Sequence, residues 1–296
     1  MRPSGTNVEL VHGDQRATVV EVGGGLRTYD VGDRHVLDGY AEDAMCASAR
    51  GQVLVPWPNR IEDGVYELAG TRYELPVDDR GTGCAIHGLV RWASWHAVDR
   101  SAAEVTMEYT LHPRPGYPFT LGVRVRYALG DAGLSVETSA RNEGDRACPF
   151  GAGHHPYLVP RDGHVDAALV RIPGATLRRL GARSLPGPAE PAEGELDLRS
   201  ARQLGATVLD TTYGDLVRDS DGLARARVDD LELWADRAWT HLQVFTGDPL
   251  PDVARRSLAI EPMTCPPNAF RSREGLRLLA PGETFSGTWG ISVDPA

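Results

Sequence analysis

The chain has 296 residues, which is enough for one large domain or two small ones with a substantial core. Composition is that of a globular protein, with 41% hydrophobic and 24% charged residues; 31 basic residues against 41 acidic residues give a net charge of −10. This acidic balance argues against nucleic acid or an anionic membrane as the main partner.

The N-terminal stretch "MRPSGTNVELVHGDQRATVV" has no apolar core of a signal peptide, and no apolar run reaches the length of a membrane span. The four cysteines are widely spaced and form no CxxC pair, which argues against a zinc ribbon or a thioredoxin-type motif. We therefore expect buried free thiols and a soluble protein of the cytoplasm.

Hydrophobic periodicity of two dominates the chain and predicts strands. The pattern predicts a hairpin over 64–75 that turns at Ala69-Gly70, and a longer hairpin in which 119–129 and 134–142 flank the turn "GDAG". Further strands are expected at 103–113, 227–236, 239–247, 256–262 and 283–293. Since no long, well-capped helical pattern is present, the prediction is an all-β protein, a large antiparallel β-sandwich that forms a single domain over 1–296.

The stretch 181–203, "GARSLPGPAEPAEGELDLRSARQ", is rich in Pro, Gly, Ala and Glu. We interpret it as a long surface loop within the domain, because strands resume after it; a domain boundary is the less favoured alternative. The arginines that precede or begin it, Arg171, Arg178, Arg179 and Arg183, are possible phosphate contacts.

The stretch "SLAIEPMTCPPNAF" contains a candidate catalytic carboxylate. On a strand, Glu261 shares one face with Ser257 and Ala259, whereas Leu258 and Ile260 occupy the other. A carboxylate on a face of small residues suits the floor of a cleft, and Pro262 is expected to end the strand. The alternative is a solvated or ion-paired glutamate at a strand end.

Two further stretches, "VPWPNRIEDGVY…GTGCAIHGLV" and "GAGHHPYLVP", also crowd polar residues among Gly, Pro and aromatic residues. Each residue has a structural alternative. His87 and His155 would serve as core histidines bonded to backbone, Arg60 as an ion-pair partner, and Asp210 as the cap of a turn. Together with Glu261, however, they suit a site that moves protons on a polyol, because carboxylate and imidazole provide acid and base near neutral pH.

His154 and His155 are adjacent, and successive side chains on a strand point to opposite faces. At most one of them can enter a given pocket. Strand alternation alone does not choose between them.

These stretches, in this order, resemble the aldose 1-epimerase (galactose mutarotase) family. The similar elements are "NRIEDGVYELAGTRYEL", His87-Gly88, the "HPY" motif at 155–157, Asp210 in "LDTTY", and "EPMTCPPNAF" at 261–270. The elements at 155–157 and 261–270 are specific, whereas the match at Asp210 is weak. The segment "VPWPNRI" departs from the usual lead of the family and resembles divergent bacterial members.

The resemblance implies a β-supersandwich in which Glu261 is the general base and His155 the general acid. Arg60, His87 and Asp210, with the neighbouring Asn59, would bind substrate. It also assigns His155 to the site, so that His154 points away and supports the sheet. Trp57 would stack on a sugar face or belong to the core.

The implied reaction interconverts the α and β anomers of a free aldohexose, and its partner is a small monosaccharide. Glu261 would take the anomeric proton and His155 would protonate the ring oxygen, so neither a cofactor nor a metal is required. A hexose-6-phosphate epimerase and a non-catalytic sugar-binding sandwich are the alternatives. The protein is expected to be a monomer or homodimer, and His87 could assist His155.

Overall fold

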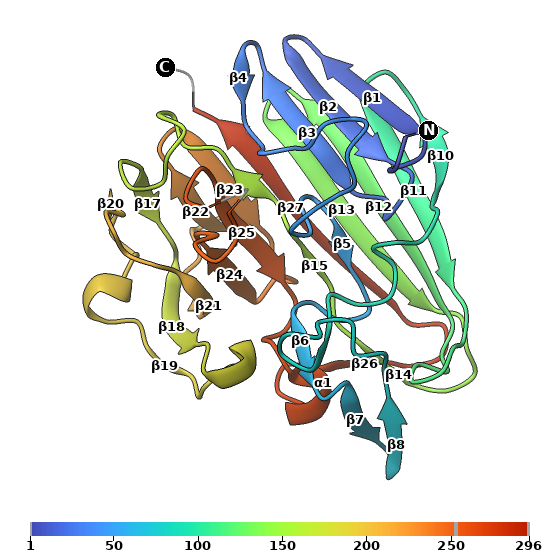
Figure 1. Cartoon of the computed structure of the whole chain (residues 1–296). Helices are drawn as coiled ribbons and strands as arrows, with labels where there is room; N and C mark the ends of the chain where they lie inside the picture. The colour runs from blue at the N-terminus through green and yellow to red at the C-terminus, as the bar shows by residue number, and fades with distance from the viewer. Residues whose placement is uncertain (1, 252–253, 295–296) are drawn as a thin grey trace.

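Two large antiparallel sheets form most of the molecule (Figure 1). The computed structural model describes residues 2–251 and 254–294. Within these residues the only α-helix is the single turn α1 (Ala269–Ser272), with two 3₁₀ turns, η1 (Ala182–Ser184) and η2 (Gly194–Leu196). The all-β prediction is confirmed. No helix in the described ranges has the length and apolar character needed to cross a membrane.

The first large sheet has nine strands. In spatial order they are β10 (His96–Arg100), β11 (Glu104–Leu111), β12 (Leu121–Gly130), β13 (Gly133–Asn142), β27 (Thr284–Val293), β23 (Leu231–Ala235), β22 (Ala224–Val228), β17 (Leu169–Arg171) and β20 (Arg202–Gln203). The predicted long hairpin is β12–β13, whose register pairs Leu121 with Asn142. Its alternating residues Val123, Val125 and Tyr127 are fully buried, because one face of the hairpin packs on the core.

The second large sheet has eight strands and carries the residues of interest. Its order is β19 (Glu190–Pro191), β18 (Gly174–Arg179), β21 (Asp210–Leu216), β24 (His241–Phe245), β25 (Leu258–Met263), β15 (Gly153–His154) and β5 (Val53–Leu54), with β16 (Tyr157–Leu158) also paired to β25. One continuous apolar cluster includes Val123 and Trp289 of the nine-stranded sheet and Leu242 and Ile260 of this sheet. The main core therefore joins the two sheets.

Smaller sheets complete the fold. They are β1 (Asn7–His12), β2 (Gln15–Val20), β3 (Leu26–Val31) and β4 (Arg34–His35) in one sheet; β6 (Arg60–Glu62) with β9 (Cys84–Ile86); β7 (Val65–Leu68) with β8 (Thr71–Glu74); and β14 (Cys148–Phe150) with β26 (Arg277–Leu279). The β7–β8 pair is the predicted hairpin, and Ala69 and Gly70 at its turn both have positive φ, 49° and 78°. Positive φ at both central residues is the geometry that a two-residue hairpin turn requires.

Three local predictions need correction. The segment 227–236 contains a hairpin turn, because Asp229 has φ of 53° and the chain reverses from β22 into β23. The stretch 181–203 contains the short edge strands β19 and β20 as well as both 3₁₀ turns.

The third correction concerns Pro262, which does not end its strand, since β25 continues to Met263. The N–H of Ile260 donates to Pro156 O and that of Thr264 to Ala152 O, so by alternation the nitrogen of Pro262 faces the gap between β15 and β16. A proline is tolerated there because that position has no ladder bond to lose.

Candidate active site

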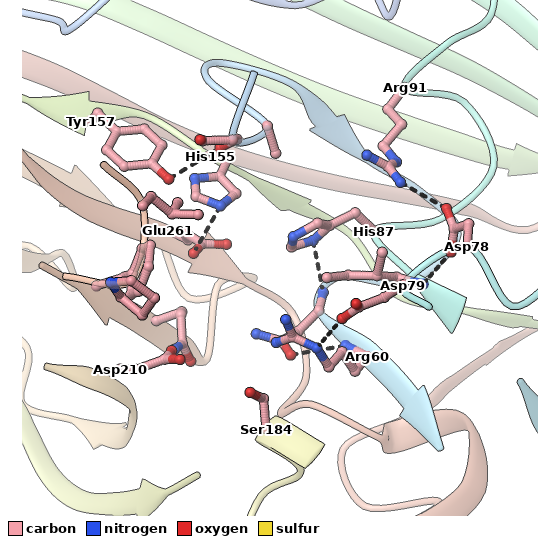
Figure 2. Close-up of a pocket in the computed structure, with 18 residues that line it drawn as sticks. Arg60, Asp78, Asp79, His87, Arg91, His155, Tyr157, Ser184, Asp210 and Glu261 are labelled. Carbon is pink, nitrogen blue, oxygen red and sulfur yellow. Dashed lines mark hydrogen bonds and ion pairs between the residues drawn. The ribbon is translucent and has the colours of Figure 1, made fainter. Parts of the chain in front are cut away.

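A cavity of about 440 Å³ opens on the eight-stranded sheet (Figure 2). Its wall includes six of the predicted site residues, Asn59, Arg60, His87, His155, Asp210 and Glu261. These residues come from segments far apart in the sequence, which the folded sheets bring together.

His155 and His154 point in opposite directions. The His155 ring lies in the cavity wall, stacked on Tyr157 with ring centroids 4.9 Å apart. The His154 ring is in the core, where Nε2 lies 2.7 Å from Thr138 Oγ1 and the imidazole packs between Trp239 and Trp289. The structure thus places the two histidines as strand alternation requires.

Glu261 lies at the floor of the cavity, 2% exposed, with Oε1 3.3 Å from His155 Nε2. Burial, and then the negative charge of Asp210, raise the pKa of Glu261 well above its usual value. Burial also lowers the pKa of His155 to about 3. Both shifts favour the neutral forms, in which the carboxyl holds the one titratable proton of the pair. Glu261 Oε2 and His155 Nδ1 are buried without a hydrogen-bond partner in the described part of the chain, which is typical of groups that meet a ligand.

Asp210, at the first residue of β21, is another carboxylate of the cavity wall. Burial raises its pKa, against the opposing influence of Arg60 and a hydrogen bond from Gln243. Gln243 Nε2 donates to Asp210 Oδ1 at 2.6 Å, while Gln243 Oε1 accepts from Thr212 Oγ1. The amide is thereby fixed in one orientation, and it holds the carboxylate in place.

Gln243 was missed by the sequence analysis. It lies opposite Glu261 in the β24–β25 register and lines the cavity. The available signal was a polar amide between Leu242 and Val244 in a buried strand, because a buried amide needs hydrogen-bond partners.

His87 is held by the backbone of Asn59. The Asn59 N–H donates to His87 Nδ1 at 3.2 Å, and the His87 N–H donates to Asn59 O. Burial, followed by the nearby charges of His155, Arg91 and Arg60, lowers the pKa of His87 well below its usual value. A neutral imidazole that accepts at Nδ1 carries its proton on Nε2, so His87 can donate a hydrogen bond to a ligand.

Two arginine–aspartate pairs form the other wall. Arg60 Nε lies 2.8 Å from Asp79 Oδ2, and Arg91 contacts Asp78 Oδ2 at 2.7 Å (Figure 2). Burial acts to raise the pKa of Asp79, but hydrogen bonds from Thr82 and Arg60 outweigh it and the pKa is lowered. Asp78, Asp79 and Arg91 were not predicted; their chain positions carry no periodic signal, and only folding brings them to the cavity.

Unfavourable backbone conformations gather around the cavity. Five non-glycine residues of its wall have positive φ: Ser48, Ala49, Asn59, His87 and Ser184. Such conformations are costly and persist where the surrounding structure enforces them, often at functional sites.

Trp57 does not belong to the cavity wall. It is 2% exposed and packs against Phe270, with ring centroids 5.5 Å apart. Of the two alternatives for this residue, the structure has core packing, because Trp57 belongs to the apolar core cluster together with Phe270 of α1. The suggested stacking on a sugar face is therefore corrected.

The arginines around 171–183 also lie outside the cavity wall. Arg183 pairs with Asp63, Arg178 with Glu274 and Arg179 with Glu190. Among the described residues, no group of three or more His, Cys, Asp or Glu side chains is arranged to hold a metal ion.

The fold defines a class, the galactose mutarotase-like β-sandwiches, and here it carries a buried carboxyl–imidazole pair in a polar cavity. A putative aldose 1-epimerase from Escherichia coli K12 superposes with a TM-score of 0.83 at 21% identity, covering 98% of this chain and 99% of that chain. The GalM/aldose epimerase homologue from C. elegans superposes with a TM-score of 0.84 at 16% identity, covering 98% of this chain and 99% of that chain. Galactose 1-epimerase from Lactobacillus acidophilus superposes with a TM-score of 0.80 at 16% identity, covering 98% of this chain and 95% of that chain.

Sequence comparison gives the family. The chain is 37% identical over 289 residues to YihR, an uncharacterized protein of E. coli K12, covering 96% of this chain and 92% of the relative. The sequence model of the family Aldose 1-epimerase matches residues 6–292. The chain belongs to the aldose 1-epimerase family.

Proposed function

We propose that the protein is an aldose 1-epimerase that interconverts the anomers of a free aldohexose. The observation that carries the proposal is the buried pair formed by Glu261 and His155, whose Oε1 and Nε2 atoms lie 3.3 Å apart at the floor of a polar cavity. A cyclic hemiacetal opens when its anomeric hydroxyl loses a proton and its ring oxygen gains one, and the pair can perform both transfers.

In the proposed reaction Glu261, as the carboxylate, takes the anomeric proton, and His155, as the imidazolium, protonates the ring oxygen. The sugar then rotates about its C1–C2 bond and closes with the two roles reversed. The open-chain stage leaves a neutral acid and a neutral imidazole, which are the forms that burial favours. The cavity would therefore stabilise this stage relative to water.

The remaining groups are suited to holding a sugar. His87 can donate from Nε2, and Asp210, fixed by Gln243, can accept from a hydroxyl. Arg60 carries hydrogens beyond the one that its Nε gives to Asp79. Each proton-transfer role contributes about 10²- to 10⁴-fold in rate in such reactions.

The charge distribution supports a neutral sugar over a hexose 6-phosphate. Arg60 and Arg91 each face an aspartate, and Asp210 and Glu261 add two more carboxylates to the cavity wall. A phosphate site would need several converging cations that are free of carboxylate partners.

An NMR assay of anomer interconversion tests the proposal. Glucose, galactose and related aldohexoses should turn over, while the 6-phosphates should have kcat/KM no greater than their parent sugars. A 6-phosphate favoured about a hundredfold, equivalent to nearly 3 kcal/mol, would contradict the choice of substrate. Tight sugar binding without any turnover would instead indicate a non-catalytic binding protein.

A further inference from the structure

A second cavity, of about 540 Å³, lies beside the first over β18, β21 and β24. His241 lines it, whereas Gln243 and Phe245, two and four residues further along β24, line the first cavity. These alternate residues share one face of the strand, so both cavities lie on the same face of the sheet. Thr212, in the wall of the second cavity, donates the hydrogen bond that orients Gln243.

The second cavity concentrates positive charge in a protein whose net charge is −10. Four guanidinium groups line it against two carboxylates: Arg178, Arg218, Arg237 and Arg277 against Asp215 and Glu274. Glu274 pairs with Arg178, and Asp215 accepts from Thr176 Oγ1 at 2.9 Å. Neither carboxylate neutralises the other three arginines.

These three arginines differ in whether their guanidinium groups are already hydrogen-bonded. Arg218 is fixed by bonds to carbonyl oxygens, including Asp236 O at 2.9 Å and Trp239 O at 2.7 Å, so its charge is held in place without a carboxylate partner. The guanidinium groups of Arg237 and Arg277 have no hydrogen-bonded acceptor within residues 2–251 and 254–294, and Arg277 lies over the Phe285 ring, 5.2 Å from its centroid. Arg237 and Arg277 can therefore both donate to an anionic oxygen.

His241 adds an acceptor to this cationic wall. The Thr240 hydroxyl donates to Thr264 O at 2.9 Å, so its oxygen accepts from His241 Nδ1, 2.8 Å away. Burial lowers the pKa of His241 to about 4, so the ring is neutral at pH 7 and its Nε2 carries a lone pair. A free acceptor in the same cavity suits a ligand hydroxyl.

We propose that this cavity is a second binding site for a small hydroxylated anion, a polyol that carries a carboxylate or a phosphate. Arg237 and Arg277 bind the anionic oxygens, the fixed charge of Arg218 attracts them, and His241 Nε2 accepts from a hydroxyl. The proposal does not rest on the epimerase reaction, because it concerns binding alone.

Isothermal titration calorimetry tests it with four probes: D-gluconate, glycerol 3-phosphate, inorganic phosphate and the neutral D-glucitol. Gluconate, glycerol 3-phosphate or both should bind, and whichever binds identifies the anionic group. Glucitol should not bind at this site. Absence of binding by both polyol anions, or glucitol binding equal to theirs, would overturn the proposal.

Variants locate the site. The double variant Arg237→Gln/Arg277→Gln alters exposed side chains and should weaken anion binding by about tenfold or more. Two control variants should bind the anions like the wild type. They are Arg16→Gln, which changes an exposed arginine of β2, and Glu261→Gln, which changes the first cavity. His241→Leu should weaken the binding of the polyol anions and leave the binding of inorganic phosphate unchanged. An unaffected double variant, or loss of binding in Glu261→Gln, would refute the second site.

Discussion

His155 Nε2 and Glu261 Oε1 lie 3.3 Å apart, and each belongs to a residue that is at most 5% exposed. A carboxyl and an imidazole in such contact titrate as one unit, and the low exposure makes the singly protonated pair the stable form. Acid and base functions are then available at the same pH.

Glu261→Gln removes the proposed base while keeping the size of the side chain. We expect kcat to fall by at least ~10² because the anomeric proton has no acceptor at this position. Saturation-transfer NMR of glucose anomers measures the rate, and thermal unfolding checks that the fold is retained. Near-normal turnover by a folded variant would remove Glu261 from the mechanism.

The two histidines should respond differently to the same change. His155→Asn should abolish most activity with little effect on stability. His154→Asn should keep activity and lower the free energy of unfolding by about 1–3 kcal/mol, because it removes the contact with Thr138 and the packing between two tryptophans. Urea denaturation measures the stability of each variant, and the anomer assay measures its activity. If His154→Asn lost activity and His155→Asn lost stability instead, the two rings would face the opposite way.

Acid should weaken the fold through His154. Burial lowers the pKa of His154 to about 3, whereas an unfolded histidine takes its proton near 6.5. The stabilising contribution of the neutral ring is therefore complete above about pH 6.5 and is lost as the pH falls from there towards 3, by up to about 1.4 kcal/mol per pH unit.

Urea unfolding measured from pH 7 to pH 4.5 tests this dependence. His154→Asn should show a shallower loss of stability with falling pH than the wild type, while the other buried histidines still contribute to both. Equal slopes in the two proteins would show that folding does not lower the pKa of His154.

Activity should persist to a lower pH than it would if it depended on a histidine with the ordinary pKa near 6.5. Since the pKa of His155 is lowered to about 3 and that of Glu261 is raised, the pair gains its second proton only in strong acid and loses its last one at a higher pH than an ordinary glutamic acid would. We expect kcat/KM to stay level from pH 7 down to about pH 5, while the protein remains folded, and to fall at alkaline pH. An acid limb centred near pH 6.5 would contradict the shared proton.

The reaction should need no metal. Prolonged dialysis against EDTA should leave kcat unchanged, because Glu261 and His155 supply both proton transfers themselves. Loss of activity that one added divalent metal restores would refute this expectation.

Local patterns predicted most of the strands, and they placed His154 and His155 on opposite faces. The period-two alternation of β12 and β13 depends only on neighbouring residues, and the facing of His154 and His155 follows from the same rule. The family motifs at 155–157 and 261–270 then indicated which histidine and which carboxylate to choose. The turn at Asp229 was missed because no glycine marks it.

The remaining wall residues could not be predicted because their role arises from pairing between distant segments. Gln243 belongs to the cavity because β24 lies between β21 and β25, and its amide is fixed by Thr212. Arg91 and Asp78 face the cavity only after the loops that carry them close on it. Pro262 remains within its strand because the neighbouring β15 and β16 leave a gap.

The sequence of β25 also disfavours pairing of this strand in a shifted register. Gln243 lies opposite Glu261, and Ile260 faces the core. A slip of this central strand by one residue would drive the carboxylate into the apolar interior and leave an isoleucine in the cavity. Burying a carboxylate without a partner is strongly unfavourable, so the shifted strand would be rejected. In refolded wild-type protein, the rate of the proposed reaction per molecule would therefore report the fraction of chains whose central strand is correctly paired.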